Sequence, residues 1–283
     1  MKKVGFIDYY LDEWHANNYP TLLKNASDGE YAACYAYAKI DSPHGGMTTK
    51  EWSEKYGVEI LDSIEEVIEK SDVLIVLSPD NPEMHEELTD LPLKSGKRVY
   101  IDKTFANDKE SALRMFENAD KHNTPCWSSS ALRFASELDD IDTSKIYKLY
   151  SEGSGEYEIY SIHQLEPIMR LMDSDPKRVM FLSDINHPSM VIEFEDGRLV
   201  QMQQTLELQQ CRGYEFTMIT VDKDNFAVEY PIKSHFFKNF MTYLIKFFET
   251  GEVPVPHRDT VNVIAVRAAG LKASKTPFTW VTV

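Results

Sequence analysis

Hydrophobic and polar positions follow two different rhythms along the chain. Over residues 1–128, short apolar runs alternate with segments of helical periodicity, two of which open on the helix-start signals Thr48 to Glu51 and Ser63 to Glu66. Repeated strand–helix alternation indicates right-handed crossovers and a parallel sheet covered by helices on both faces. Strands are expected at residues 4–8, 31–36, 58–60, 72–77, 98–102 and 125–130, and a further helix is expected to be capped by Asn107 with Glu110 three positions on.

Beyond about residue 130, strand-like runs follow one another with turn signals between them, which predicts a mostly antiparallel sheet. Residues 1–128 are therefore expected to form a Rossmann-like, doubly wound α/β domain, and residues 129–283 an α+β domain. The predicted strands of the second domain are 145–150, 178–182, 190–194, 199–206, 216–221, 226–230 and 278–283, and its helices are 164–172, 234–249 and 260–274.

An aromatic stripe with helical spacing marks the helix over residues 234–249. Such a stripe is more typical of a core or an interface than of a cofactor site. It consists of Phe236, Phe237, Phe240, Leu244, Phe247 and Phe248.

Composition narrows the choice of partners. The 283 residues carry a net charge of −16, which argues against nucleic acid or an anionic membrane surface as a partner. No apolar run approaches the roughly 18 residues of a membrane span, and the apolar run at the N-terminus is too short for a signal peptide, so a cytoplasmic location is expected. Cys34, Cys126 and Cys211 form no CxxC pair, so they are interpreted as buried thiols rather than as disulfide or zinc ligands.

Several segments together resemble the Gfo/Idh/MocA family of sugar-type oxidoreductases. They are the run from 55 to 66, the run from 95 to 106 with Asp102-Lys103-Thr104 in place of a Glu-Lys-Pro signature, Ser130-Ala-Leu-Arg-Phe134, the glycine pair Gly153-Ser-Gly155, and Ser161-Ile-His163-Gln-Leu-Glu166. The resemblance covers almost the whole chain, and it depends on the order and spacing of these segments rather than on any one of them.

The resemblance implies hydride transfer between NAD or NADP and a CH–OH carbon of a sugar or polyol. It assigns His163 as the general base and Lys103 as the cation that holds the developing alkoxide. It also implies a homodimer or homotetramer formed through the C-terminal sheet. The cofactor-binding candidates are Asp8, Tyr9, Ser78, Pro79 and Lys103, and the substrate-binding candidates are Arg133, Tyr160, Glu166, Trp14 and His15.

The chain departs from the family pattern at four places. The first turn has no glycine and carries Asp8, Asp12 and Glu13, whose carboxylates would repel a dinucleotide's phosphates. The acid that usually binds the adenosine ribose is replaced by Ala36 or Tyr37, the aspartate four residues before the catalytic histidine is Ile159, and the proline of the lysine signature is Thr104.

Two interpretations of different classes follow. The first is an oxidoreductase acting on CH–OH groups. The second is a non-catalytic or regulatory sugar-binding protein that kept the cleft and lost NAD(P), with Tyr157 joining the substrate-binding candidates. His163, Glu166 and His187 offer the residue types of a zinc or manganese site, but no motif fixes a third ligand, so no metal is predicted.

Overall fold

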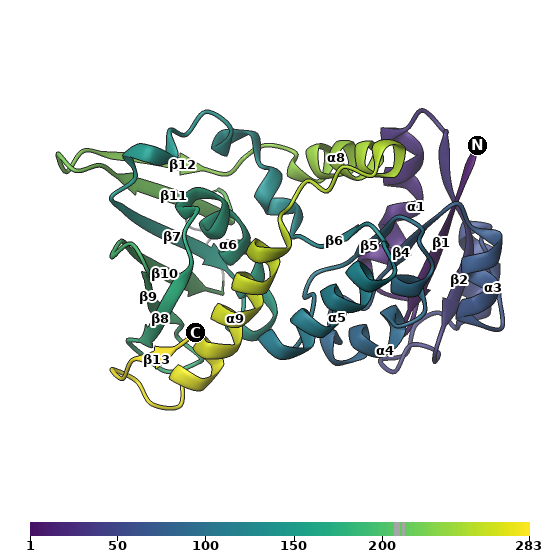
Figure 1. The fold of residues 1–283 in the computed structure, drawn as a ribbon, viewed down its shortest axis with the longest axis horizontal. Coiled ribbons are helices and arrows are strands. Elements are labelled where there is room, and N and C mark those ends of the chain that lie inside the picture. Colours follow the sequence, from purple (N-terminus) through teal and green to yellow (C-terminus); the bar gives the residue numbers. More distant parts are fainter. Residues whose placement is uncertain (207–209, 211–212) are drawn as a thin grey trace. The chain divides into compact units, whose positions relative to one another are not determined.

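The structure is a computed structural model, and it describes residues 1–206, 210 and 213–283. The chain forms two compact units. Unit 1 consists of Met1–Ser129 and Phe240–His257, and unit 2 consists of Ser130–Asn239 and Arg258–Val283. Each unit has a β-sheet of its own (Figure 1).

The sheet of unit 1 is parallel and has the strand order β3-β2-β1-β4-β5-β6, so the predicted doubly wound fold is confirmed. Strands β2 and β3 lie on one side of β1, and strands β4 to β6 lie on the other, so the strand order switches between β1 and β4. Folds of this kind bind ligands at the carboxyl ends of the strands at such a switch point. The strands are β1 (Lys2–Asp8), β2 (Tyr31–Ala38), β3 (Glu59–Ile60), β4 (Val73–Val76), β5 (Val99–Ile101) and β6 (Cys126–Trp127).

Helices α2, α3 and α5 of unit 1 begin at side-chain caps. Thr48 and Glu51 form the predicted capping box of α2, and Ser63 caps α3. The cap predicted for α5 at Asn107 is wrong, because the Asp108 carboxylate accepts the Ser111 N–H at 2.8 Å. The helices are α1 (Trp14–Ala26), α2 (Thr49–Tyr56), α3 (Ile64–Lys70), α4 (His85–Thr89) and α5 (Lys109–Lys121).

Helix α8 (Phe236–Thr250) brings most of the aromatic stripe into unit 1. The Phe240 ring packs against Tyr19, Tyr100 and Trp127, with ring centroids 6.2, 5.3 and 5.7 Å away. Phe240, Leu244, Phe247 and Phe248 are buried, whereas Phe236 and Phe237 are half-buried. Most of this helix therefore completes the core of unit 1 although it lies late in the sequence.

The sheet of unit 2 has the order β12-β11-β7-β10-β9-β8-β13, and every neighbouring pair is antiparallel except β7 with β10. The prediction of a mostly antiparallel sheet is confirmed. The strands are β7 (Lys148–Ser154), β8 (Pro176–Phe181), β9 (Ser189–Phe194), β10 (Leu199–Thr205), β11 (Phe216–Val221), β12 (Ala227–Pro231) and β13 (Val281–Thr282).

Helices α6 (Tyr157–Met172) and α9 (His257–Ala273) meet at Tyr157. The Tyr157 hydroxyl lies 3.4 Å from the Arg267 carbonyl oxygen, and a Cβ at Gly270 would lie 1.8 Å from that hydroxyl. Only glycine leaves room there for the tyrosine. Helix α6 begins seven residues before the predicted start at Gln164, so His163 lies inside the helix rather than at its beginning.

Among the described residues, none of the helices combines the length and the apolarity needed to cross a membrane. Cys126 is buried as predicted, Cys34 is only half-buried, and Cys211 lies outside the described residues.

Candidate functional site

The first turn of unit 1 ends in a helix cap made by an acid. Glu13 is the N-cap of α1, and its extended backbone (φ −134°) turns the side chain back over the start of the helix. The carboxylate accepts the His15 N–H at 2.6 Å and also accepts the Ala16 N–H. Two of the N–H groups that a helix N-terminus offers to an anion are therefore bonded to the chain's own carboxylate.

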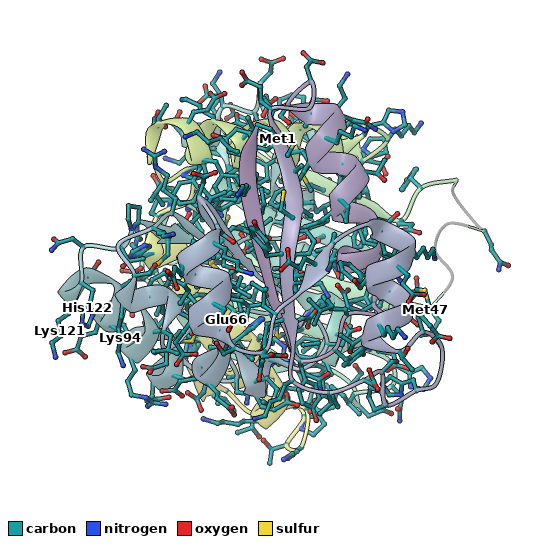
Figure 2. The ribbon with its side chains drawn as sticks, turned by 90° about the vertical axis from the view of Figure 1, so that its right-hand side faces the viewer. Met1, Met47, Glu66, Lys94, Lys121 and His122 are labelled. Carbon is teal, nitrogen blue, oxygen red and sulfur yellow. The ribbon has the colours of Figure 1, made fainter. Side chains whose placement is uncertain are left out.

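The remaining residues of this turn fix its path. Tyr10 and Leu11 bury their side chains. The Asp12 carboxylate accepts the Met47 N–H at 2.8 Å and the Asn17 side-chain amide at 3.0 Å. Figure 2 looks onto this unit, with Met1 at the amino end of β1 and Met47 well away from it. The turn is thus a built structure with side chains inside it, unlike a glycine-rich loop.

Three buried carboxyl groups gather around this turn, namely Asp8 at the end of β1, Glu13, and Asp102 after β5. Burial raises the pKa of Asp8 well above its usual range, and the Glu13 carboxylate adds to that shift. Burial also raises the pKa of Glu13 to about 7. Asp102 differs: burial opposes its ionisation, but His15, 2.6 Å away, together with Lys103 holds its pKa below the usual range.

Lys103 follows β5 and is 7 % exposed. Its ammonium nitrogen lies 3.5 Å from both the Pro79 carbonyl oxygen and the Asp80 carboxylate, so it points at the loop after β4. In that loop Ser78 is buried and adopts a left-handed φ of +82°. The peptide bond between Lys103 and Thr104 is cis. The structure thus brings Lys103, Pro79 and Ser78 to one edge of the sheet.

Asp8, Tyr9, Trp14 and His15, the candidates from the first turn, lie near the carboxyl end of β1. The Tyr9 N–H donates to the Asp8 carboxylate at 2.7 Å. Trp14 is 51 % exposed, and its ring meets that of His15 edge-on. Of these four side chains, Asp8 and His15 are directed into the unit and Trp14 lies largely in solvent.

His163 lies on α6 in unit 2. Its Nδ1 is 2.6 Å from the Ser130 hydroxyl oxygen, and the ring of Tyr160 lies 5.5 Å away, edge-on. When Nδ1 carries the proton and donates it to Ser130, Nε2 is left as an acceptor. The helix thereby places an imidazole of defined orientation beside Tyr160.

Arg133 and Glu166, two of the predicted substrate-binding residues, contact each other. The Arg133 guanidinium lies 3.3 Å from the Glu166 carboxylate and also donates to Asp259 on α9. All three side chains are buried. The Arg133 guanidinium and the two carboxylates thus form a buried hydrogen-bonded cluster, in which each charged group is paired with another group of the same unit.

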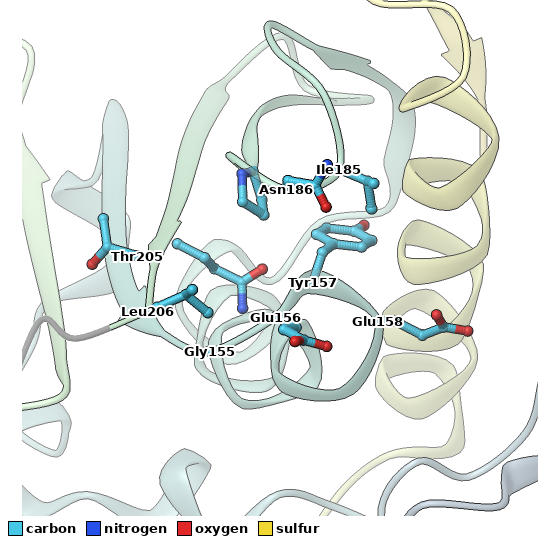
Figure 3. A pocket seen from close by; sticks show the side chains of 10 residues that line it. Gly155, Glu156, Tyr157, Glu158, Ile185, Asn186, Thr205 and Leu206 are labelled. Carbon is cyan, nitrogen blue, oxygen red and sulfur yellow. The ribbon is translucent and has the colours of Figure 1, made fainter.

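A pocket of about 300 Å³ opens at the start of α6. Figure 3 shows Ile185 and Asn186 on one side of it and Thr205 and Leu206 on another. Gln204 also lines it and is 3 % exposed, and neither polar atom of its side-chain amide has a hydrogen-bond partner in the part of the chain that the structure describes. A buried amide of this kind offers one donor group and one acceptor to a ligand.

A second pocket, of about 570 Å³, adjoins the first. Tyr160 and Ile159 line it, together with Ser154 and Glu215. The Tyr160 ring also meets the His163 ring edge-on, so Tyr160 links this pocket to an imidazole that does not itself line it. Ile159, four positions before His163, is 40 % exposed.

Two polar side chains of unit 2, Gln204 and Asp259, are not predicted as site residues from the sequence. The Arg133–Asp259 pair spans 126 positions of sequence, so no local pattern reveals it. Gln204 is one of several glutamines in β10, and only its burial distinguishes it. Within the described residues, no group of three histidine, cysteine or acidic side chains could hold a metal ion.

Residues 31–130 match the model of a family described as an oxidoreductase family with an NAD-binding Rossmann fold. The resemblance to the Gfo/Idh/MocA family is confirmed. The Gfo/Idh/MocA match begins at the first residue of β2, so it leaves out β1, the acidic turn and α1. No curated protein sequence matches the chain.

Solved structures share the fold over nearly the whole chain. A probable dehydrogenase from Thermotoga maritima has a TM-score of 0.78 at 16% identity, with 99% of this chain and 98% of that chain covered. Myo-inositol dehydrogenase from Lactobacillus casei, in complex with NAD(H) and myo-inositol, has a TM-score of 0.81 at 14% identity, with coverages of 100% and 96%. Scyllo-inositol dehydrogenase from the same organism, with NAD(H) and scyllo-inositol, has a TM-score of 0.77 at 13% identity, with coverages of 99% and 98%.

Proposed function

We propose that this protein acts on a hydroxyl group of a sugar or related polyol, as an oxidoreductase of the Gfo/Idh/MocA type. The observation that carries the proposal is the orientation of His163 by Ser130 at 2.6 Å, next to Tyr160, a side chain that lines a pocket. The family match over residues 31–130 supports the reaction class, and the inositol complexes of two similar structures support the substrate class.

His163 is the proposed base. With Nδ1–H donated to Ser130, its Nε2 accepts a hydrogen bond from a ligand hydroxyl and then takes the proton of that hydroxyl. Lys103 is the proposed cation for the developing negative charge, because its buried ammonium lies more than 3 Å from its nearest oxygens and has donor capacity left.

The pockets of unit 2 suit a neutral ligand rich in hydroxyl groups. Glu156 and Glu158 line the first pocket, and their carboxylates accept hydroxyl hydrogen bonds but repel anions. The Gln204 amide adds a donor and an acceptor inside it. A volume of about 300 Å³ is at the lower end of the range for small-molecule sites and admits one sugar ring.

NAD is the cofactor that the family description and the similar structures indicate. The start of α1, where this fold places the pyrophosphate, does not fit that group, because the Glu13 carboxylate already accepts the His15 and Ala16 N–H groups. The proposed roles of His163 and Lys103 therefore rest on the chain's own residues and on no contact with a bound cofactor.

The test is a binding and turnover assay with a panel of inositols and hexoses. Polyol binding is measured by calorimetry, and oxidation is followed as NAD or NADP reduction. We expect at least one polyol to bind, and His163→Ala to lower turnover far more than affinity. The control is His235→Ala, the same change at an exposed histidine of unit 2, which leaves both quantities unchanged.

Ser130→Ala separates orientation of the imidazole from simple loss of structure. We expect turnover to fall and its pH profile to move, because the ring loses the partner of Nδ1, while polyol affinity stays within about twofold. Absence of binding by every member of the panel would refute the proposed substrate class.

The alternative is a sugar-binding protein without turnover. Two observations favour it, namely Glu13 at the start of α1 and Ile159 at the position of the family's catalytic aspartate. Polyol binding without oxidation under any cofactor condition is the result that distinguishes this function from the first.

A further inference from the structure

We infer that the Glu13 side chain occupies the anion site that this fold offers at the N-terminus of α1, so that a dinucleotide reaches that site only when the side chain is removed. The inference deepens the proposed function, and it rests on that proposal only in taking unit 1 as the part that meets a cofactor. According to this inference, the turn does not fit a pyrophosphate because of one residue, Glu13.

The hydrogen bonds at the helix start show the occupation directly. A pyrophosphate in this fold accepts N–H groups from the first turn of the helix after β1 and benefits from the helix dipole. In α1 the Glu13 oxygens take these roles, one on the His15 N–H at 2.6 Å and the other on the Ala16 N–H. The carboxylate and a phosphate would therefore compete for the same donors.

The turn holds Glu13 in this position. The side chain is 8 % exposed, so it does not swing freely into solvent. The preceding residue, Asp12, is tied to the Met47 N–H and to Asn17, and Leu11 before it is 1 % exposed. Rotation of Glu13 out of the site would have to disturb a packed turn.

The surrounding charges reinforce the exclusion of an anion. Asp8 and Asp102, both 1 % exposed, lie near Glu13, and one oxygen of Asp8 has no hydrogen-bond partner among the residues that the structure describes. The basic side chains nearby already face carboxylates, His15 with Asp102 at 2.6 Å and Lys103 with Asp80 at 3.5 Å. A phosphate entering here would meet more acids than cations.

Calorimetric titration with inorganic pyrophosphate and with NADH tests the inference. In the Glu13→Gly variant the N-cap position keeps a residue that tolerates it, while the two N–H groups become available. We expect E13G to bind both probes at least about tenfold more tightly than the wild type. Glu13→Ala serves as the second variant if thermal unfolding shows that E13G does not fold.

Two matched variants separate occupation from charge. Glu13→Gln removes the charge and keeps one of the two accepting oxygens, so it frees at most one helix N–H, and we expect a smaller gain in affinity than in E13G. Asp12→Asn removes one charge from the same turn without freeing a helix N–H, and we expect a change of less than about twofold.

Three results would overturn the inference: tight binding of NADH by the wild type, no gain in E13G and E13A when both are folded, or equal gains in E13Q and E13G. Polyol binding is measured on the same preparations. Absence of polyol binding by the wild type, together with a gain of pyrophosphate binding in E13G, would count against the proposed function and leave the inference standing.

Discussion

Helices α1 and α6 have the same residue type at the N-cap, but the two glutamate side chains are placed in opposite ways. Glu13 caps α1 with its own carboxylate, whereas Glu156, the N-cap of α6, makes no side-chain cap hydrogen bond and lines the pockets instead. The backbone differs accordingly, with φ −134° at Glu13 and −79° at Glu156. A glutamate at an N-cap is thus hydrogen-bonded to the helix start in unit 1 and part of a pocket wall in unit 2.

The difference teaches that the path of the turn, rather than the residue type, decides whether a helix start is open to a ligand. The turn before α1 buries Tyr10 and Leu11 and presses Glu13 onto the helix. The turn before α6 passes through Gly155, whose φ of +97° needs glycine and whose absent Cβ leaves room for the Tyr160 ring. Side chains fill the space at the start of α1, whereas the glycine leaves space at the start of α6.

The buried charges of the two units differ in the same way. In unit 1 the carboxyl groups of Asp8, Glu13 and Asp102 share few cations, and one oxygen of Asp8 lacks a partner among the described residues. In unit 2 the Arg133 guanidinium is held between Glu166 and Asp259. We therefore expect removal of charge to stabilise the first cluster and to destabilise the second.

Arg133→Met gives the largest expected effect. The change leaves Glu166 and Asp259 buried without their cation, and the free energy of unfolding should fall by about 3–5 kcal/mol. Denaturant unfolding monitored by circular dichroism measures it. The control is Arg114→Met, which removes the exposed pair with Glu86 and should lower the free energy of unfolding far less. Equal losses in the two variants would show that the Arg133 cluster is no stronger than a surface pair.

Glu13→Gln should change the pH dependence of stability. Burial raises the pKa of Glu13 from 4.5 to about 7, so between these values the folded state binds a proton that the unfolded state has released. Stability from this group is therefore present at low pH and is lost as pH rises to about 7. Relative to wild type, E13Q should gain about 1–3 kcal/mol between pH 4.5 and 8, measured by denaturant unfolding.

The titratable groups that face Glu13 also contribute to the pH dependence of stability. Asp8, whose pKa is also raised, acts in the same direction in both proteins, and His15 and Asp102 form a pair that is likewise common to both. Because the Glu13 carboxylate contributes to the raised pKa of Asp8, the difference between wild type and E13Q reports Glu13 together with that contribution. A difference that does not vary with pH would contradict the buried, proton-binding carboxyl group.

Glu156→Asn gives the smallest expected effect. Asparagine is a preferred N-cap, and its short side chain can accept an N–H of the first turn of α6, which receives no side-chain cap in the wild type. The free energy of unfolding should rise by about 0.5–1 kcal/mol, as read from the denaturant midpoint. No gain would indicate that the start of α6 is already satisfied.

The sequence predicted the two sheets and the acidic turn well, because strand periodicity and the absence of glycine are local signals. It could not tell which of Asp8, Asp12 and Glu13 would cap α1, since Asp12 is claimed by the distant Met47 N–H. It also missed the first two turns of α6, where β-branched and aromatic residues such as Ile159 and Tyr160 favour strands locally and packing decides for a helix.

Glu13 accepts hydrogen bonds from the backbone amides of His15 and Ala16, and NMR detects most directly whether an anion reaches these two amides. The ¹⁵N–¹H signals of His15 and Ala16 are followed during titration with inorganic pyrophosphate, in the wild type and in E13G. The account predicts that both signals move in E13G and stay in place in the wild type, because Glu13 holds these N–H groups there. Movement of both signals in the wild type, at the same pyrophosphate concentrations as in E13G, would contradict it.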